Sequence, residues 1–414
     1  MRKALIGAIA TVAFVAPLLP AAGASAVVGP VTPAGQFGMT VNAVGRTIAV
    51  PKSPGSLRLW DTGTRWDQIE TARGVYNWAP LDAAVNRARA AGIRDILYVM
   101  GSTPLWAARR TTAAIEKGDA CGPGTAAHPA SDAYYLEYLR ALLARYRGRI
   151  TSYEAWNESN LPMFYRGSAA QIAALTAKAY AIIKAQPAPR PALTSPSWLL
   201  RYWTTNRENQ LSQFRVRGWP FDAANVHAYP FATQGPDDRV RLLVAFRARL
   251  AALGARRAVW DTEVNFGDRR PGYAYRVYTG GMAARYVARA YIDSRRYGVA
   301  RTYWYSWDSH ILGIDLIDSL GRPTSGGIAF ATVRKWIAGL HWNGCTTASN
   351  HISRCALTTT TGAKRTIIYT PGPSVRTVVP AHALSACTLD NKCRTIRPGT
   401  TFYANGNPQY IVGA

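Results

Sequence analysis

The chain has 414 residues, of which 48% are hydrophobic and 11% aromatic, and this composition excludes a largely disordered protein. The 49 Lys and Arg residues outnumber the 23 Asp and Glu residues, so the net charge is +26. The basic residues are scattered and accompany no recognised nucleic-acid motif, so we expect no nucleic-acid partner. The charge fits either a solvated arginine-rich surface or attraction to an anionic cell wall or acidic glycan.

Residues 1–26 have the pattern of an export signal. Arg2 and Lys3 precede an apolar run over 4–19, and Ala24-Ser25-Ala26 supplies small residues for cleavage. The run is short for a membrane anchor, and no second stretch has the length of a membrane span. The sequence therefore predicts a secreted or cell-wall-associated protein with no membrane span.

Apolar strand-like runs alternate with amphipathic helical windows in the next part of the chain, which indicates a parallel sheet with crossover helices. In one window Leu139, Leu142 and Tyr146 fall on a single face. We predict eight strands, at 36–41, 56–61, 95–101, 150–157, 191–196, 224–229, 258–264 and 301–307. The sequence therefore predicts an α/β fold, a (β/α)8 TIM barrel over residues 27–340.

From about residue 340 the chain becomes threonine-rich, with alternating runs separated by Gly, Pro and Asn. These runs predict short antiparallel strands and a small C-terminal β-sandwich domain over 341–414. The expected strands lie at 356–361, 365–370, 375–379, 401–404 and 409–412.

Five cysteines in an exported chain indicate disulfides. The short separations favour Cys345 with Cys355 and Cys387 with Cys393, although three connectivities are possible among these four. Cys121 is left over, and we expect a free or intermolecular thiol in a Gly/Pro-rich loop.

Glu158 and Glu263 end the predicted strands four and seven, and the carboxyl ends of barrel strands meet at the rim where catalytic side chains converge. The 105 residues between them correspond to three βα units. A retaining glycosidase needs a carboxylic acid for the leaving oxygen and a carboxylate nucleophile about 5 to 5.5 Å away. We therefore predict Glu158 as acid/base and Glu263 as nucleophile, with no metal and no organic cofactor.

Several motifs resemble those of glycoside hydrolase clan A. Trp156-Asn157-Glu158 is similar to its strand-four Asn-Glu motif, and Thr262-Glu263 to its strand-seven nucleophile. The segment 226–230, Val-His-Ala-Tyr-Pro, resembles the His-x-Tyr-Pro element, especially of family 39-like members, and 303–307 resembles the aromatic strand eight. The resemblance covers roughly residues 36 to 340 and implies a retaining, β-specific glycosidase.

The resemblance also implies roles for the neighbours of the two glutamates. Asn157 would hydrogen-bond the sugar 2-hydroxyl, and Tyr229 would orient Glu263. Arg58 on strand two would lie near Glu263 and keep it ionised, although it could instead simply pair with an acid of the barrel. His227 would bond the same carboxylate or the sugar, or would be a satisfied core histidine.

Aromatic side chains are expected to bind the sugar, because an aromatic face packs against the C–H face of a pyranose. Trp307 would form the floor of the subsite, while Trp66 and Trp106 follow strand ends and would line the cleft. We expect most other tryptophans, Trp60 among them, to be core residues. Glu154 and Asp261 lie inside their strand motifs and are expected to be structural.

The sequence therefore predicts a secreted, monomeric retaining glycoside hydrolase that cleaves β-glycosidic bonds of an oligo- or polysaccharide. One alternative is a transglycosylase that uses the same site. Another is a non-catalytic carbohydrate-binding protein of the cell wall. The glutamates at both predicted catalytic positions argue against this alternative.

Overall fold

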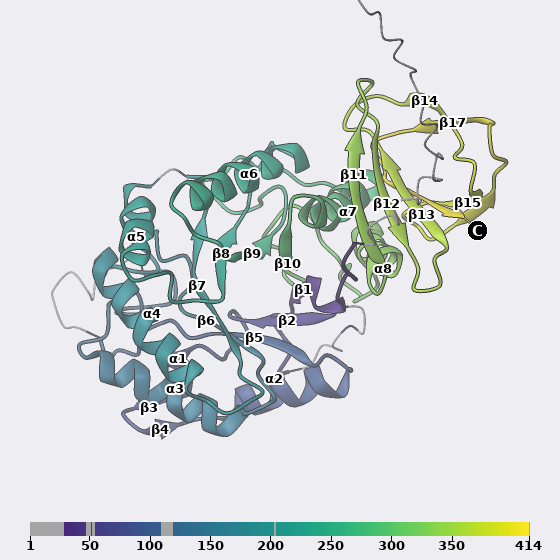
Figure 1. Cartoon of the computed structure of the whole chain (residues 1–414). Helices are drawn as coiled ribbons and strands as arrows, with labels where there is room; N and C mark the ends of the chain where they lie inside the picture. Colours follow the sequence, from purple (N-terminus) through teal and green to yellow (C-terminus); the bar gives the residue numbers. More distant parts are fainter. Residues whose placement is uncertain (1–28, 47–50, 52–53, 109–118, 203, 414) are drawn as a thin grey trace, which may run out of the picture.

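The computed structural model describes residues 29–46, 51, 54–108, 119–202 and 204–413, so the predicted export signal lies outside the described residues. Eight parallel strands close into a barrel in the order β1-β10-β9-β8-β7-β6-β5-β2 (Figure 1), and the predicted TIM barrel is confirmed. The strands are β1 (Phe37–Thr40), β2 (Ser56–Leu59), β5 (Asp95–Val99), β6 (Ser152–Glu154), β7 (Ala192–Leu199), β8 (Ala223–His227), β9 (Ala258–Val264) and β10 (Val299–Trp304).

Each barrel strand overlaps one predicted strand, but some ends differ. Strand β6 ends at Glu154, three residues before the predicted end, and β10 likewise ends at Trp304. In the first case the chain leaves the β6 ladder and bonds to β7 instead, since Ser197 N donates to Trp156 O at 2.8 Å. The predicted strand end at 157 therefore belongs to the loop that carries the functional residues.

Helices cover the outside of the barrel. They are α1 (Trp66–Ile69), α2 (Ala79–Ala90), α3 (Asp132–Tyr146), α4 (Ala169–Lys184), α5 (Thr205–Arg215), α6 (Pro236–Ala252), α7 (Gly280–Arg296) and α8 (Ser325–Ile337), with a short 3₁₀ helix η1 (Ala34–Gln36) and a small sheet of β3 (Glu70–Ala72) and β4 (Val75–Tyr76). The predicted apolar face of α3 is buried. Ser168 caps α4, because its Oγ accepts from Gln171 N at 3.2 Å while the Gln171 side chain accepts from Ser168 N.

The C-terminal region forms an antiparallel sheet in the order β11-β12-β13-β18-β15-β16 and a two-stranded sheet of β14 and β17, consistent with the predicted sandwich. The strands are β11 (His341–Thr347), β12 (Ser353–Thr358), β13 (Lys364–Tyr369), β14 (Val375–Val378), β15 (Ala383–Cys387), β16 (Cys393–Thr395), β17 (Thr401–Ala404) and β18 (Gln409–Gly413).

Strands β11, β15 and β16 were not among the predicted strands. Asn343-Gly344 inside β11 is typical of a turn, yet the strand absorbs it by a register shift between Trp342 and Cys345. Strands β15 and β16 are short, and their pairing depends on contacts that local sequence does not reveal.

The two favoured cysteine pairs are both formed. Cys345 and Cys355 lie directly opposite each other on β11 and β12, and Cys387 and Cys393 do so on β15 and β16. Each disulfide therefore joins neighbouring strands of one sheet. Cys121 is a half-buried free thiol, and burial raises its pKa to about 12.

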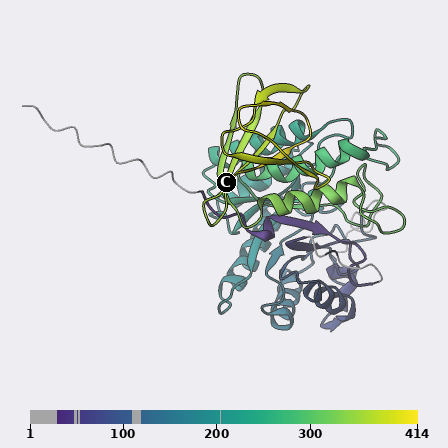
Figure 2. The ribbon, with the colours of Figure 1, turned by 90° about the vertical axis from the view of Figure 1, so that its right-hand side faces the viewer.

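The C-terminal strands lie at one side of the barrel, beside α7 and α8 (Figures 1 and 2). Trp336 of α8 stacks on Tyr410 of β18 with ring centroids 5.1 Å apart. Tyr369 of β13 donates to Asp293 of α7 at 2.9 Å. These buried contacts join the sheet to the barrel, while a domain boundary at 340 stays a prediction.

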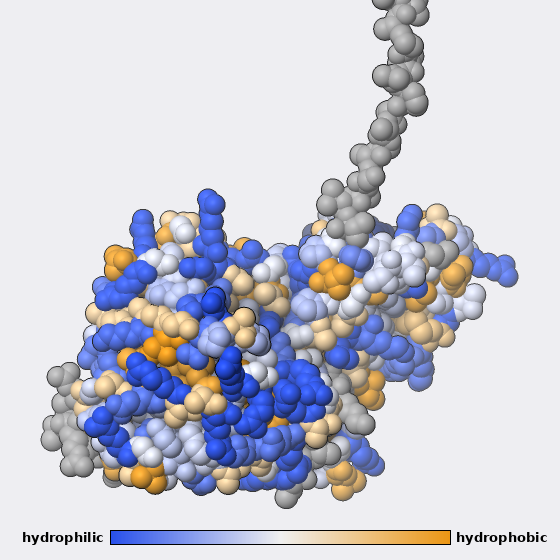
Figure 3. All heavy atoms as spheres, turned by 60° about the horizontal axis from the view of Figure 1, so that its bottom comes forward, coloured by the Kyte–Doolittle hydropathy of each residue, from blue (hydrophilic) through white to orange (hydrophobic). Residues whose placement is uncertain are grey.

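Hydrophilic residues cover most of the surface seen in Figure 3, with smaller hydrophobic patches between them. Among the described residues, no helix combines the length and apolar character that crossing a membrane requires.

Candidate active site

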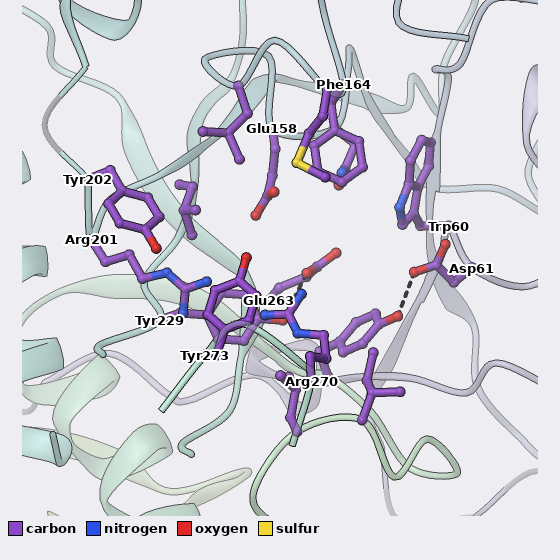
Figure 4. A pocket seen from close by; sticks show the side chains of 17 residues that line it. Trp60, Asp61, Glu158, Phe164, Arg201, Tyr202, Tyr229, Glu263, Arg270 and Tyr273 are labelled. Carbon is purple, nitrogen blue, oxygen red and sulfur yellow. Dashed lines mark hydrogen bonds between the residues drawn. The ribbon is translucent and has the colours of Figure 1, made fainter. Parts of the chain in front are cut away.

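A pocket of about 290 Å³ opens at the carboxyl ends of the barrel strands (Figure 4). Its walls come from the loops that follow several different strands, as expected for the functional rim of such a barrel. The lining includes Trp60 and Asp61 after β2, Asn157 and Glu158 after β6, Tyr229 after β8, Glu263 of β9 and Tyr305 after β10.

Glu158 and Glu263 face the same pocket, and their residues are 8% and 7% exposed. One oxygen of each carboxylate and a ring nitrogen of His227 all lie within 4.8 Å of one another. A sugar ring bound between the two carboxylates could therefore be reached by both. This spacing fits the short separation of a retaining pair.

Two donors hold the two oxygens of Glu263. Arg58 Nη1 forms an ion pair with Oε1, and Tyr229 OH donates to Oε2 at 2.8 Å. Burial raises the pKa of Glu263, and the nearby Glu158 raises it further. The charges of His227 and Arg58 lower it. The pKa of Glu263 lies above its ordinary value as a result. The contacts with Arg58 and Tyr229 favour the ionised form that a nucleophile needs.

Arg58 connects three barrel strands from a fully buried position on β2. Its Nε and Nη2 donate to the two oxygens of Glu154 at 2.7 and 2.9 Å, and Nη2 also donates to Asn157 Oδ1 at 2.8 Å. Burial opposes the charge, but Glu154 and Glu263 raise the pKa of Arg58 beyond its ordinary value. Arg58 therefore stays cationic and fixes Glu263 and Asn157 in one arrangement, with Glu154 as its structural partner.

His227 contacts the acid/base candidate more closely than the nucleophile candidate. Its Nδ1 lies 2.8 Å from Glu158 Oε1 but 3.5 Å from Glu263 Oε2. The residue is 0% exposed, so it cannot touch a sugar in the pocket. The shorter contact of His227 is therefore with Glu158, while the expected contact with Glu263 is present at the longer distance.

The backbone at Glu158 has a positive φ of 39°, which is uncommon for a residue with a side chain. Its N–H donates to Ser197 Oγ of β7 at 2.8 Å. The hydroxyl of Ser197 therefore supports this strained turn, and the sequence analysis did not identify this role.

None of the three tryptophans expected to bind the sugar lines this pocket. Trp66 is fully buried, donates from Nε1 to Glu70 at 2.6 Å and stacks on Tyr138, so it cannot contact substrate. Trp106 packs against Trp66 and donates to the Glu70 carbonyl at 2.8 Å, outside the pocket. A tryptophan that follows a strand can turn into the layer between barrel and helices as readily as into the cleft.

Trp307 also lies outside the residues that line the pocket. It is half-buried, and its backbone N–H donates to Thr40 O at 2.9 Å. Because β10 ends at Trp304, the next residue, Tyr305, takes the position in the pocket. Trp60, expected in the core, lines the pocket as well. Its position directly after β2 is the signal that could have identified it.

Glu158, His227 and Glu263 form the only cluster of metal-ligand type among the described residues. Both oxygens of Glu263 already have protein partners, and the guanidinium of Arg58 contacts the carboxylate that a cation would need. A bound cation would compete with that fixed positive charge. The arrangement therefore fits proton transfer and nucleophilic attack better than metal binding.

Comparison with known proteins gives structural relatives. No family model and no curated protein matches the chain. A glucosidase from Croceicoccus marinus has a TM-score of 0.66 at 13% identity, with 94% of this chain and 96% of the other covered. A glycoside hydrolase family 30 subfamily 8 xylanase from Clostridium acetobutylicum has a TM-score of 0.62 at 14% identity, with 94% and 98% covered.

A GH51 arabinofuranosidase from Xanthomonas axonopodis pv. citri gives a TM-score of 0.56 at 10% identity, with 94% of this chain and 96% of the other covered. Identities this low show a common fold. Over 94% of its length, the chain has the fold of these glycoside hydrolases.

Proposed function

We propose that the protein is a secreted retaining glycoside hydrolase that cleaves β-glycosidic bonds of an oligo- or polysaccharide by double displacement. One observation carries the proposal: Glu158, in the loop after β6, and Glu263, on β9, present carboxylate oxygens within 4.8 Å of each other in one pocket. Two carboxyl groups at such a separation suit a nucleophile and an acid/base acting on the same anomeric carbon.

In the first step Glu158 donates its proton to the glycosidic oxygen while a Glu263 oxygen attacks the anomeric carbon. The bond to the leaving group breaks, and the sugar remains as an ester of Glu263. Arg58 and Tyr229 hold the two oxygens of Glu263 before attack, so little reorganisation is needed when the charge moves onto the sugar.

In the second step the ionised Glu158 takes a proton from water, and that water attacks the anomeric carbon. The ester to Glu263 breaks, and the sugar leaves with its original configuration. His227 beside Glu158 stabilises the carboxylate formed between the two steps. Asn157 has its Oδ1 held by Arg58, which leaves its amide N–H groups for the sugar 2-hydroxyl.

Export and location remain part of the proposal. The pattern over 1–26 favours secretion, and the two disulfides favour an oxidising compartment. We propose a monomer, secreted or associated with the cell wall, that needs no metal and no organic cofactor. The narrower likeness to family 39 rests on the segment 226–230 alone.

The mechanism is tested by two substitutions and a matched control. Glu263→Gln removes the nucleophile and is expected to abolish turnover without unfolding the chain. Glu158→Gln is expected to slow substrates with poor leaving groups far more than dinitrophenyl glycosides, which need no protonation. Glu137→Gln, on the surface of α3, should change neither turnover nor the dependence of the rate on the leaving group.

The configuration of the first product is followed by NMR on any aryl glycoside or polysaccharide that is cleaved. Full activity of Glu263→Gln, or a product of inverted configuration, would overturn the mechanism. Added acceptor sugars distinguish hydrolysis from transglycosylation, and binding without any turnover would identify a non-catalytic carbohydrate-binding protein.

A further inference from the structure

Two arginines line the pocket beside the catalytic pair. Arg201 follows β7, and Arg270 lies in the loop after β9. In Figure 4 both lie near Tyr229 and Tyr273, whereas Asp61 lies on the other side of Glu263 from Arg201. The pocket is therefore basic on one side and acidic on the other.

Aromatic rings hold Arg201 in place. Its guanidinium carbon lies 5.3, 5.4 and 5.9 Å from the ring centroids of Tyr202, Tyr273 and Tyr229. Stacking of this kind orients a guanidinium but leaves the N–H groups at its edge free to donate. Because Tyr229 also donates to Glu263, a single ring separates Arg201 from the nucleophile.

Arg201 has no hydrogen bond and no ion pair to any residue within the described parts of the chain, and its buried Nε has no hydrogen-bond partner among those residues. A buried donor without a partner costs free energy, so such groups usually have a ligand or another role. Arg201 lines the pocket in which the sugar is proposed to bind.

Arg270 is partly neutralised by a buried carboxylate. Its Nε and Nη2 donate to the two oxygens of Asp268 at 2.9 and 2.7 Å, and its guanidinium carbon lies 4.4 Å from the Tyr273 centroid. Burial opposes ionisation of Asp268, but the bonds from Arg270 and the charge of Arg201 keep its pKa below the ordinary value. One carboxylate thus faces two guanidinium groups on this side of the pocket.

We propose that Arg201 and Arg270 form a subsite for an acidic group of the glycan, a carboxylate or a sulfate ester. The sugar that carries it occupies the catalytic position or the next position along the chain. This inference rests on the proposed function and names its substrate class. Guanidinium forks suit planar or tetrahedral oxyanions, and the net charge of +26 would raise the local concentration of such polymers.

The test compares an acidic polysaccharide with the same polymer made neutral. A panel of uronate-containing and sulfated polysaccharides is offered to the full chain, each beside its carboxyl-reduced or desulfated form. Cleavage is measured with the wild-type chain, and binding with the Glu263→Gln chain. The reduced and desulfated arms identify which oxyanion is recognised.

In this panel Arg201→Gln is expected to lower kcat/KM on the acidic polymer roughly 10- to 100-fold. The neutral form should be cleaved as before. Arg270→Gln should act in the same direction, and Arg201→Lys should restore only part of the loss, because an ammonium lacks the planar fork. Arg241→Gln removes an equal charge from the exposed face of α6 and should leave both forms unaffected.

The inference is overturned if acidic and neutral forms are cleaved and bound equally, or if Arg201→Gln weakens both alike. Cleavage of neutral glycans alone would remove the acidic subsite and leave the hydrolase standing. If no glycan is cleaved, the proposed function fails, and the binding arm still decides whether Arg201 recognises the acidic group. Absence of both cleavage and binding overturns both.

Discussion

His227 and Glu158 share one proton. The Thr262 hydroxyl donates to Asn225 Oδ1 at 2.7 Å, so its oxygen must accept from His227 Nε2, 3.1 Å away, and Nε2 therefore carries a hydrogen. The 2.8 Å contact between Nδ1 and Glu158 Oε1 then contains the one further proton, held by the acid or by the imidazole.

His227→Gln is expected to move the basic limb of the kcat/KM profile to lower pH, by about one unit. Burial opposes protonation of His227, but Glu263 and Glu158 raise its pKa above the ordinary histidine value, so the imidazole favours holding the proton. A glutamine cannot hold that proton. His128→Gln, beside Tyr165 and away from the pocket, is the matched control. An unchanged basic limb in His227→Gln would remove the shared proton from the mechanism.

The same linkage has a consequence for stability. Because the folded chain raises the pKa of His227, its protonation stabilises the fold fully below the ordinary histidine value. This contribution is lost as pH rises through the raised value. The difference in unfolding free energy between wild type and His227→Gln should therefore shrink from pH 6 to pH 9. Urea unfolding at a series of pH values measures it, and a difference that grows with pH contradicts the assignment.

Tyr229→Phe is expected to lower kcat by about 10- to 100-fold, since it deletes a hydrogen bond to a charged oxygen of Glu263. Loss of that donor favours the protonated acid, so the acidic limb of the pH profile should move to higher pH. Tyr165→Phe, whose hydroxyl contacts His128, provides the control. Equal profiles for both variants would show that Tyr229 does not act on Glu263.

Arg58→Met should lower the free energy of unfolding by about 3 to 5 kcal/mol, because it leaves Glu154 and Glu263 buried without their cation. The loss should be smaller at pH 5 than at pH 8, since protonation removes part of the buried negative charge. Arg145→Met breaks the more exposed pair with Asp82 and should cost less than about 1 kcal/mol. Chemical denaturation of the two variants compares them directly, and similar losses would refute the central role of Arg58.

Replacing Cys345 and Cys355 by serine should destabilise the C-terminal sheet by about 2 to 3 kcal/mol, the value expected for a loop of this length. Activity should be retained, because the pocket is lined by residues between Trp60 and Leu312. Thermal unfolding and a glycosidase assay measure the two effects. Loss of activity in a folded variant would show that the C-terminal region supports the site.

Local pattern was enough to predict the barrel and the placement of Glu158 and Glu263 at its rim. The alternation of strands and helices identified all eight barrel strands, and the positions of Glu158 and Glu263 near strand ends indicated a common rim. These features repeat at short range, so neighbouring residues encode them. The pairing of Cys345 with Cys355 likewise followed from a short separation.

Only the tertiary structure decided which side chains meet. It showed His227 against Glu158 rather than Glu263, Trp66 buried behind the rim, and Trp60 and Tyr305 in the pocket in place of Trp307. The direction of a side chain at a strand end depends on the tilt and stagger with which the barrel closes, which no local window contains. For the same reason the sequence alone could not bring Arg201 and Arg270, from loops 69 residues apart, to the same tyrosine ring.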